Sequence, residues 1–201
     1  MSLNRRSFLT TSVIGLGVSS LPTMGAFAKA PGSTPPRLME KALAALAKHR
    51  RDILHTDVIA IADFGVASSS ARFHLVNLIN GKVTSMLVAH GKGSDPSHTG
   101  WLQSFSNVHG SNASSKGSFV SSQLYVGKHG PSRRLLGLDP ENDTALDRAI
   151  VVHAASYVSQ DMIKAHNKIG RSQGCFAVSE DKLRMVLDQL GSGRLLFADR
   201  S

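Results

Sequence analysis

The sequence contains one cysteine, one tryptophan and two tyrosines among its 201 residues. A single cysteine excludes an intramolecular disulfide framework and any zinc or iron–sulfur site that needs several thiolates. Aromatic residues make up only 5% of the chain and form no stripe interleaved with basic side chains, so we expect no nucleic-acid partner. The sequence carries no cofactor motif and no histidine pair at metal-ligand spacing, so we expect neither a cofactor nor a metal.

What the chain does contain is enough apolar material for a folded domain. Hydrophobic residues account for 41% and charged residues for 18% of the sequence, which excludes wholesale disorder. The length predicts one domain. The formal net charge of +9 favours an anionic partner, such as an acidic polymer or a lipid surface, without identifying it.

The first 28 residues have the three-part pattern of an export signal. Arg5 and Arg6 precede an uncharged, mildly apolar stretch, and Ala26 and Ala28 are the small residues that a signal peptidase recognises. The arginine pair followed by Ser-Phe-Leu indicates the twin-arginine type. The apolar stretch is shorter than the ~20 residues of a membrane span. We therefore predict cleavage after Ala28, a periplasmic mature protein and no transmembrane segment in it.

A core helix with a basic start is the alternative for this region, and Gly15, Gly17 and Pro22 disfavour it. Removal of the signal leaves 21 basic and 14 acidic side chains, a net charge of +7, so the signal does not create the basic balance. Residues 29–36 are rich in Pro, Gly and Ser and indicate a linker. The remaining residues, 37–201, are predicted to form a single domain.

Short strands separated by turns dominate this predicted domain. Asn80-Gly81 lies between two strand-like runs and is a strong hairpin signal. Helical spacing predicts two helices, over residues 38–51 and 179–190, with Ser179 as the N-cap of the second. Many strands and few helices predict a mainly β fold, a sandwich or barrel with peripheral helices. The predicted strands cover residues 58–62, 73–79, 83–88, 119–126, 134–138, 149–152 and 194–197.

Residues 91–118 form a long segment rich in glycine and serine, with few apolar side chains. Long loops in compact domains are usually functional or disordered. We therefore consider this segment a candidate mobile lid over a site.

Cys175 is the candidate nucleophile. A thiol needs a nearby imidazole, cation or helix N-terminus to ionise near neutral pH. Gly174 permits a close approach of the backbone to a substrate, and the amide groups around Gly174 and Cys175 are candidate donors to a developing oxyanion. Arg171 adds positive potential nearby. The alternative, that this lone cysteine is a small buried hydrophobe, stays open.

His153 is the candidate general base, because it follows the apolar run 149–152 and lies 22 residues before Cys175. A purely structural histidine is the alternative. His166, nine residues before Cys175 in a polar stretch, is the competing base. The remaining loop histidines lack regular spacing and look scattered: His90, His98, His109 and His129.

Together with His153, five segments form an ordered set of motifs: residues 90–95, 105–107, 114–117, 127–130 and 170–175. This set resembles the L,D-transpeptidase catalytic domain family of bacterial cell-wall enzymes, in its proteobacterial branch. The resemblance spans about residues 53–199, nearly all of the predicted mature chain. Several ordered motifs over this length are more specific than the Ser-x-Gly-Cys motif alone.

The resemblance implies a β-sandwich catalytic domain that acts on peptidoglycan stem peptides. Cys175 would attack the peptide carbonyl carbon that follows an L-configured centre of the stem, and a thioester to Cys175 would form. His153 would accept the thiol proton, and Ser172 would support the loop. The backbone N–H groups of Gly174 and Cys175 would bind the oxyanion. An amine from a neighbouring stem would release the acyl group. A carbapenem is an expected covalent inhibitor.

Some positions depart from the family's pattern. Gln173 stands where many members have histidine, Ala154 where many have glycine, and no arginine closely follows Cys175. Two alternatives therefore stay open: an L,D-carboxypeptidase or endopeptidase that uses water, and a non-catalytic cell-wall-binding domain. Substrate contacts are expected from Arg171, Gln173, Lys92 and Lys128, with Arg133 a further candidate.

Overall fold

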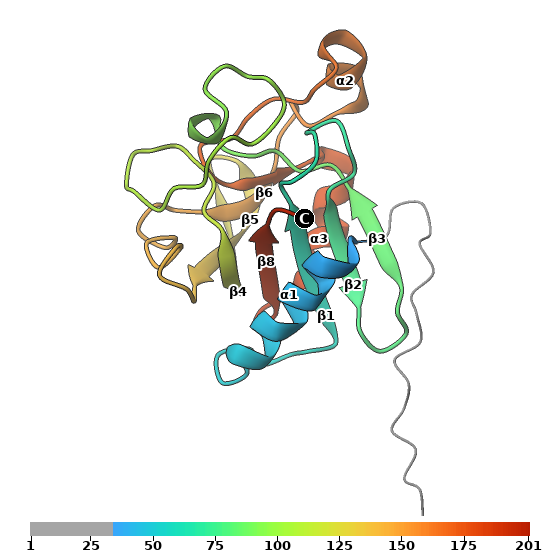
Figure 1. Cartoon of the computed structure of the whole chain (residues 1–201), viewed down its shortest axis with the longest axis vertical. Helices are drawn as coiled ribbons and strands as arrows, with labels where there is room; N and C mark the ends of the chain where they lie inside the picture. Colours follow the sequence, from blue (N-terminus) through green and yellow to red (C-terminus); the bar gives the residue numbers. More distant parts are fainter. Residues whose placement is uncertain (1–33) are drawn as a thin grey trace, which may run out of the picture.

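The computed structural model describes residues 34–201. The predicted export signal, cleaved after Ala28, and most of the predicted linker lie outside these residues. The described part of the chain forms one eight-stranded sheet with three α-helices (Figure 1). The strands are β1 Val58–Asp63, β2 Phe73–Asn77, β3 Val83–Met86, β4 Gly117–Gly127, β5 Gly130–Gly137, β6 Val151–Ala154, β7 Phe176–Val178 and β8 Leu195–Asp199. The helices are α1 Pro36–Lys48, α2 Gln160–His166 and α3 Glu180–Leu190. The prediction of a mainly β fold with peripheral helices is confirmed.

The sheet is mixed, with the strand order β3-β2-β1-β8-β4-β5-β6-β7. The β1/β8 and β6/β7 pairs are parallel, and the other pairs are antiparallel. An isolated bridge between Ala89 and Ala177 connects the segment after β3 to β7. Because β3 and β7 are the outermost strands, this bridge brings the two ends of the sheet together.

The hairpin predicted at Asn80-Gly81 joins β2 and β3. Gly81 has φ +72°, the left-handed conformation that favours glycine. The side chain of Asn77 accepts hydrogen bonds from the N–H groups of Ile79 and Asn80 and closes the turn. Local sequence therefore determines this hairpin.

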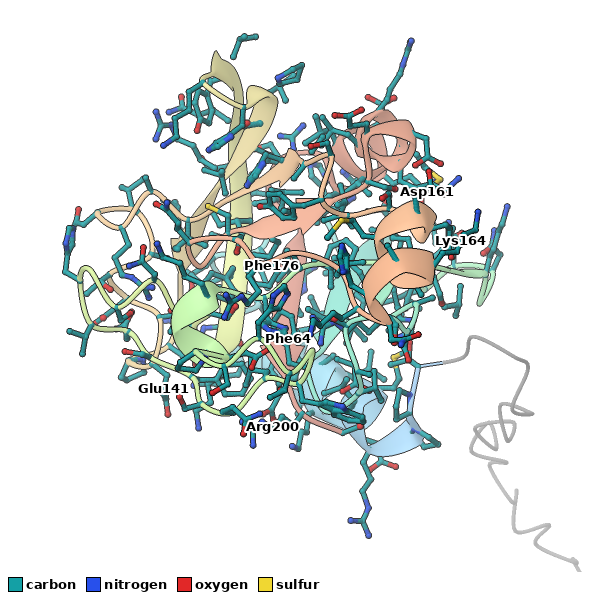
Figure 2. All side chains as sticks on the ribbon, turned by 90° about the horizontal axis from the view of Figure 1, so that it is seen from above. Phe64, Glu141, Asp161, Lys164, Phe176 and Arg200 are labelled. Carbon is teal, nitrogen blue, oxygen red and sulfur yellow. The ribbon has the colours of Figure 1, made fainter. Side chains whose placement is uncertain are left out.

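Both faces of β1 are covered, which explains its uninterrupted apolar sequence. Ile59 and Ile61 pack with α1, while Ala60 and Ala62 belong to the main core cluster, which also contains residues of α3. Aromatic rings fill the centre of that cluster: the Phe119 and Phe176 centroids lie 5.4 Å apart, and those of Phe64 and Phe176 lie 6.1 Å apart. Figure 2 shows Phe64 and Phe176 near the centre of the molecule.

Two details of the helices could not be predicted from the local sequence. Helix α2 was not predicted, because none of its seven residues is fully buried and its core contacts come from two adjacent, partly buried residues, Met162 and Ile163, which give no helical period. Ser159 caps α2 by accepting a hydrogen bond from the Met162 N–H. Ser179 occupies the N-cap position of α3 as predicted, but its side chain makes no capping hydrogen bond.

Candidate active site

The loop before β7 holds Cys175 and is shaped by Ser172. The Ser172 hydroxyl donates to the carbonyl oxygen of Cys175 at 2.7 Å and accepts from the Gly174 N–H at 3.1 Å. The Ser172 backbone pairs with the chain around Gly91: its N–H donates to His90 and its carbonyl accepts from Lys92. These contacts place the buried Ser172 at the base of the cysteine loop.

Gly174 has a conformation and a setting that other residues resist. Its φ is +112°, and a Cβ atom there would lie 2.7 Å from the Ala113 carbonyl oxygen and 2.9 Å from Ile150 Cδ1. Its N–H is already bonded to Ser172 Oγ. The oxyanion role that we predicted for this N–H would therefore require that bond to break.

Cys175 and His153 line the same cavity, which has a volume of about 470 Å³. The parallel pairing of β6 with β7 explains this placement. His153 is in register with Ala177, which is two residues after Cys175. Cys175 directly precedes the first residue of β7, so this pairing brings the cysteine loop next to the strand that carries His153.

The His153 imidazole is held in one tautomer. Its Nδ1 lies 2.7 Å from the Ala154 carbonyl oxygen, which can only accept, so Nδ1 carries the proton of the neutral ring and Nε2 is left as the basic nitrogen. Burial lowers the pKa of His153, and the neighbouring His129 and Lys128 lower it further. The ring is therefore neutral near pH 7 and able to accept a proton.

The Cys175 thiol is protonated in the resting site. Burial raises its pKa, while a backbone hydrogen bond from Val151 and the charges of Lys128 and Arg148 act in the opposite direction. The Sγ atom lies 3.6 Å from the carbonyl oxygen of Ala149 and donates its proton to it. Ala149 itself has φ +53°, a conformation that residues with a side chain rarely adopt.

Arg148 is a site residue that sequence reasoning missed. Its guanidinium donates to the carbonyl oxygens of Ser106 and Ala113 at 2.8 and 2.6 Å, and to Ser115 Oγ at 2.6 Å. It thus ties the 91–118 segment to the cysteine side of the cavity. No motif marks Arg148 in the sequence, so no signal could have found it.

The predicted substrate-binding residues divide into two groups. Lys128, Arg171 and the exposed Gln173 line the cavity, although the Arg171 guanidinium donates to the carbonyl oxygens of Asp95 and Pro96. Within residues 34–201, Lys92 is exposed and does not line this cavity. Arg133 does not line it either and instead donates to the carbonyl oxygens of Ser122 and Leu187.

The histidines are arranged differently from our prediction. His166 lies on α2, exposed and outside the cavity, so its position does not suit a competing base. His109 and His129, which looked scattered in the sequence, both line the cavity. His90 is buried between Arg72 and Asp95: its Nδ1 lies 2.7 Å from Arg72 Nη2 and its Nε2 lies 3.3 Å from Asp95 Oδ2.

The 91–118 segment lies beside the cavity, where a lid would be needed. His109, Gly110 and Asn112 contribute to the lining. The segment is held by hydrogen bonds from the Ser114 N–H to Ser94 Oγ and from the Gly91 N–H to Ser114 Oγ. Its position agrees with the lid hypothesis, and its mobility stays a prediction.

Across residues 34–201, no group of three or more His, Cys, Asp or Glu side chains is arranged to hold a metal ion. Over the same residues, no helix combines the length and the apolar character needed to cross a membrane.

Comparison with known proteins identifies the family. The sequence model of the L,D-transpeptidase catalytic domain matches residues 32–198. No curated protein matches the chain.

Solved structures with similarity to the chain have low sequence identity. An L,D-transpeptidase from Mycobacterium smegmatis is 14% identical, with 71% of this chain and 58% of that chain covered and a TM-score of 0.45. The helical cell shape determining protein Pgp2 from Campylobacter jejuni is 10% identical, with 84% and 57% covered and a TM-score of 0.46. L,D-transpeptidase 3 from Mycobacterium tuberculosis, in complex with a faropenem-derived adduct, is 13% identical, with 72% and 60% covered and a TM-score of 0.39. The chain thus spans less than two thirds of the length of these proteins.

Proposed function

The chain belongs to the L,D-transpeptidase catalytic domain family, and from this premise we propose that it is a cysteine L,D-transpeptidase acting on peptidoglycan stem peptides. One observation carries the proposal: Cys175 lines the same cavity as His153, whose Nδ1 is tied to a backbone carbonyl so that Nε2 is the basic nitrogen. We also propose export by a twin-arginine signal in residues 1–28, cleavage after Ala28 and a periplasmic location.

Acylation begins with transfer of the Cys175 proton to His153 Nε2. The thiolate attacks the carbonyl carbon after the L-centre of the donor stem, and the carbon–oxygen double bond becomes an oxyanion. Collapse of this intermediate breaks the amide bond to the D-residue. The leaving amine takes the proton from His153, and a thioester to Cys175 remains.

Deacylation reverses these roles. The amine of an acceptor stem loses a proton to His153 as it attacks the thioester carbonyl. A new amide forms, the sulfur leaves as thiolate, and His153 returns the proton to it. With water as the acceptor, the same sequence releases a free carboxylic acid.

The electrostatics of the cavity support this sequence of steps. The raised pKa of Cys175 and the lowered pKa of His153 keep both groups neutral until the proton moves. Lys128 and Arg148 then stabilise the thiolate and the oxyanion. The lining includes these cations and Arg171 but no carboxylate among the described residues, which suits a stem peptide that carries carboxylate groups.

Product analysis tests the proposal. The mature protein is incubated with a stem tetrapeptide, with and without an amine acceptor, beside Cys175→Ala and the matched exposed-site variant His166→Ala. A Cys175-dependent amide that forms only with the acceptor is expected. Cys175-dependent hydrolysis that the acceptor does not divert would assign the chain as a carboxypeptidase. Absence of any Cys175-dependent product would refute the enzyme assignment.

A carbapenem provides an independent probe of the same thiol. We propose that its β-lactam carbonyl acylates Cys175, since ring opening produces a thioester of the same kind. The expected result is a mass gain of one drug molecule that is lost in Cys175→Ala.

A further inference from the structure

The turn between β4 and β5 brings His129 onto the catalytic base. The rings of His129 and His153 stack with their centroids 4.3 Å apart and their planes at 20°. His153 is 2% exposed, whereas His129 is exposed to solvent. His129 therefore covers one face of the His153 ring.

Contacts within the hairpin hold the turn that carries His129. Gly127 pairs with Gly130 and Tyr125 with Ser132, so paired strands lead up to the turn. The Arg134 guanidinium lies over the Tyr125 ring, 4.4 Å from its centroid, and braces the hairpin. Because β5 also pairs with β6, at Arg133 and Arg134, the hairpin is attached to the strand that carries His153.

Stacking on His129 restricts the tilt of the His153 ring, which its single hydrogen bond does not. The bond from Nδ1 to the Ala154 carbonyl selects the tautomer, but one hydrogen bond still lets the ring tilt. A second planar ring at van der Waals distance restricts that tilt. We propose that His129 is a positioning residue: its ring stack holds Nε2 of His153 in line with the Cys175 thiol. This inference rests on the proposed function of Cys175 and His153.

His129 also affects the pKa of His153. After burial, His129 and Lys128 are the groups that lower the pKa of His153. Removal of His129 therefore raises the pKa of the base and moves the acid limb of the rate profile to higher pH. The other titratable or charged groups that line this cavity are Tyr125 of the same hairpin and four residues from other parts of the fold: His109, Arg148, Arg171 and Cys175.

Two substitutions separate stacking from charge. His129→Ala removes the ring, whereas His129→Phe keeps a planar ring without the imidazole nitrogens. His166→Ala is the matched control, because it removes an exposed histidine outside the cavity. The rate of Cys175 acylation by a carbapenem is measured by intact mass from pH 5 to pH 9 on the mature protein, and NMR follows the titration of the His153 ring.

His129→Ala is expected to lower the rate of Cys175 acylation on the high-pH plateau about tenfold, which is a small part of the rate enhancement that a positioned general base provides. His129→Phe should keep the plateau within about threefold of the unmodified protein, since its ring still stacks. Both variants should shift the acid limb and the His153 titration to higher pH. A general loss of fold stability would lower the rate without moving the pH profile, and His166→Ala should leave all of these readouts unchanged.

The outcomes separate this inference from the proposed function. An unchanged plateau and titration in His129→Ala would overturn the inference, and so would a His129→Phe variant as slow as His129→Ala. If Cys175 in the unmodified protein reacts with no carbapenem and forms no stem product, the proposed function fails. The NMR readout then decides the inference alone: a His153 ring whose chemical shift and titration ignore His129→Ala overturns it.

Discussion

Arg72 Nη2 lies 2.7 Å from His90 Nδ1, and both side chains are buried. Arginine can only donate, so His90 accepts at Nδ1 and donates from Nε2 to Asp95. The carboxylate of Asp95 also accepts from the N–H groups of Thr99 and Gly100. The carbonyl of His90 in turn accepts from the N–H of Ser172, so this buried network lies directly behind the cysteine loop.

Loss of the Arg72 guanidinium should destabilise the fold strongly. Arg72→Met leaves His90 Nδ1 and the carbonyl oxygens of Val66 and Val88 without their donor. Removal of one partner from a buried charged network typically costs about 3–5 kcal/mol. Urea unfolding of the mature protein measures this loss. Arg184→Met, at a side chain that is 96% exposed, is the control and should stay within about 0.5 kcal/mol of the unmodified protein. A loss below about 1 kcal/mol in Arg72→Met would contradict the prediction.

Stability should fall as the pH drops from about 6.5 to about 4. Burial, together with the charge of Arg72, lowers the pKa of His90 from 6.5 to about 4. In this window the unfolded chain binds a proton at His90 that the folded protein excludes, so the free energy of unfolding rises with pH and is lost on acidification. One such proton gives a slope of about 1.4 kcal/mol per pH unit.

The measurement for this pH dependence is urea unfolding at several pH values, with His90→Gln for comparison. The pKa values of His74 and His153 are also lowered by burial, so they add slopes of the same sign in both proteins. The difference between the two proteins isolates His90. The same slope in both would show that His90 does not exclude the proton.

The sequence was most informative where the physical cause is local. The conformation of the Asn80-Gly81 turn is determined by a few neighbouring residues. The uninterrupted apolar run of β1 reflects burial of both faces of that strand. The segment 170–175 likewise predicted the cysteine loop, because the bonds of Ser172 to Cys175 and Gly174 lie within it.

Contacts between distant segments could not be predicted in this way. His129 meets His153 only because β5 pairs with both β4 and β6, and nothing in its local sequence indicates this. Lys92 was expected at the site from its motif, yet among the described residues its side chain is exposed outside the cavity. Helix α2 has no fully buried residues, so its sequence does not show apolar residues repeated at helical spacing.

Gly174→Ala should abolish most of the reactivity at Cys175. The new methyl group would meet the Ala113 carbonyl at 2.7 Å, and the φ of +112° disfavours a side chain. A loop displacement of ~1 Å at a catalytic group can cost about 100-fold in rate, so we expect a loss of this order in carbapenem acylation. Gly81→Ala is the control, since its φ of +72° imposes a backbone penalty in a turn away from the cavity. Equal acylation rates in the two variants would refute the steric argument.

Arg148 should have two separable roles, in thiolate stabilisation and in loop attachment. Its charge lowers the pKa of Cys175, and its guanidinium binds Ser106, Ala113 and Ser115. Arg148→Met should therefore raise the pKa of the thiol and slow its alkylation by iodoacetamide near pH 8. It should also speed amide hydrogen exchange over residues 106–115.

Arg148→Lys distinguishes these roles, because lysine keeps the positive charge but lacks the planar array of donors. Alkylation of Cys175 should remain within about threefold of the unmodified protein, as expected when the local charge persists. Hydrogen exchange over residues 106–115 should rise almost as much as in Arg148→Met. If Arg148→Lys instead slowed alkylation as strongly as Arg148→Met while exchange stayed protected, the charge of Arg148 could not be what favours the thiolate. The positions of the donors around Cys175 would then have to account for its reactivity.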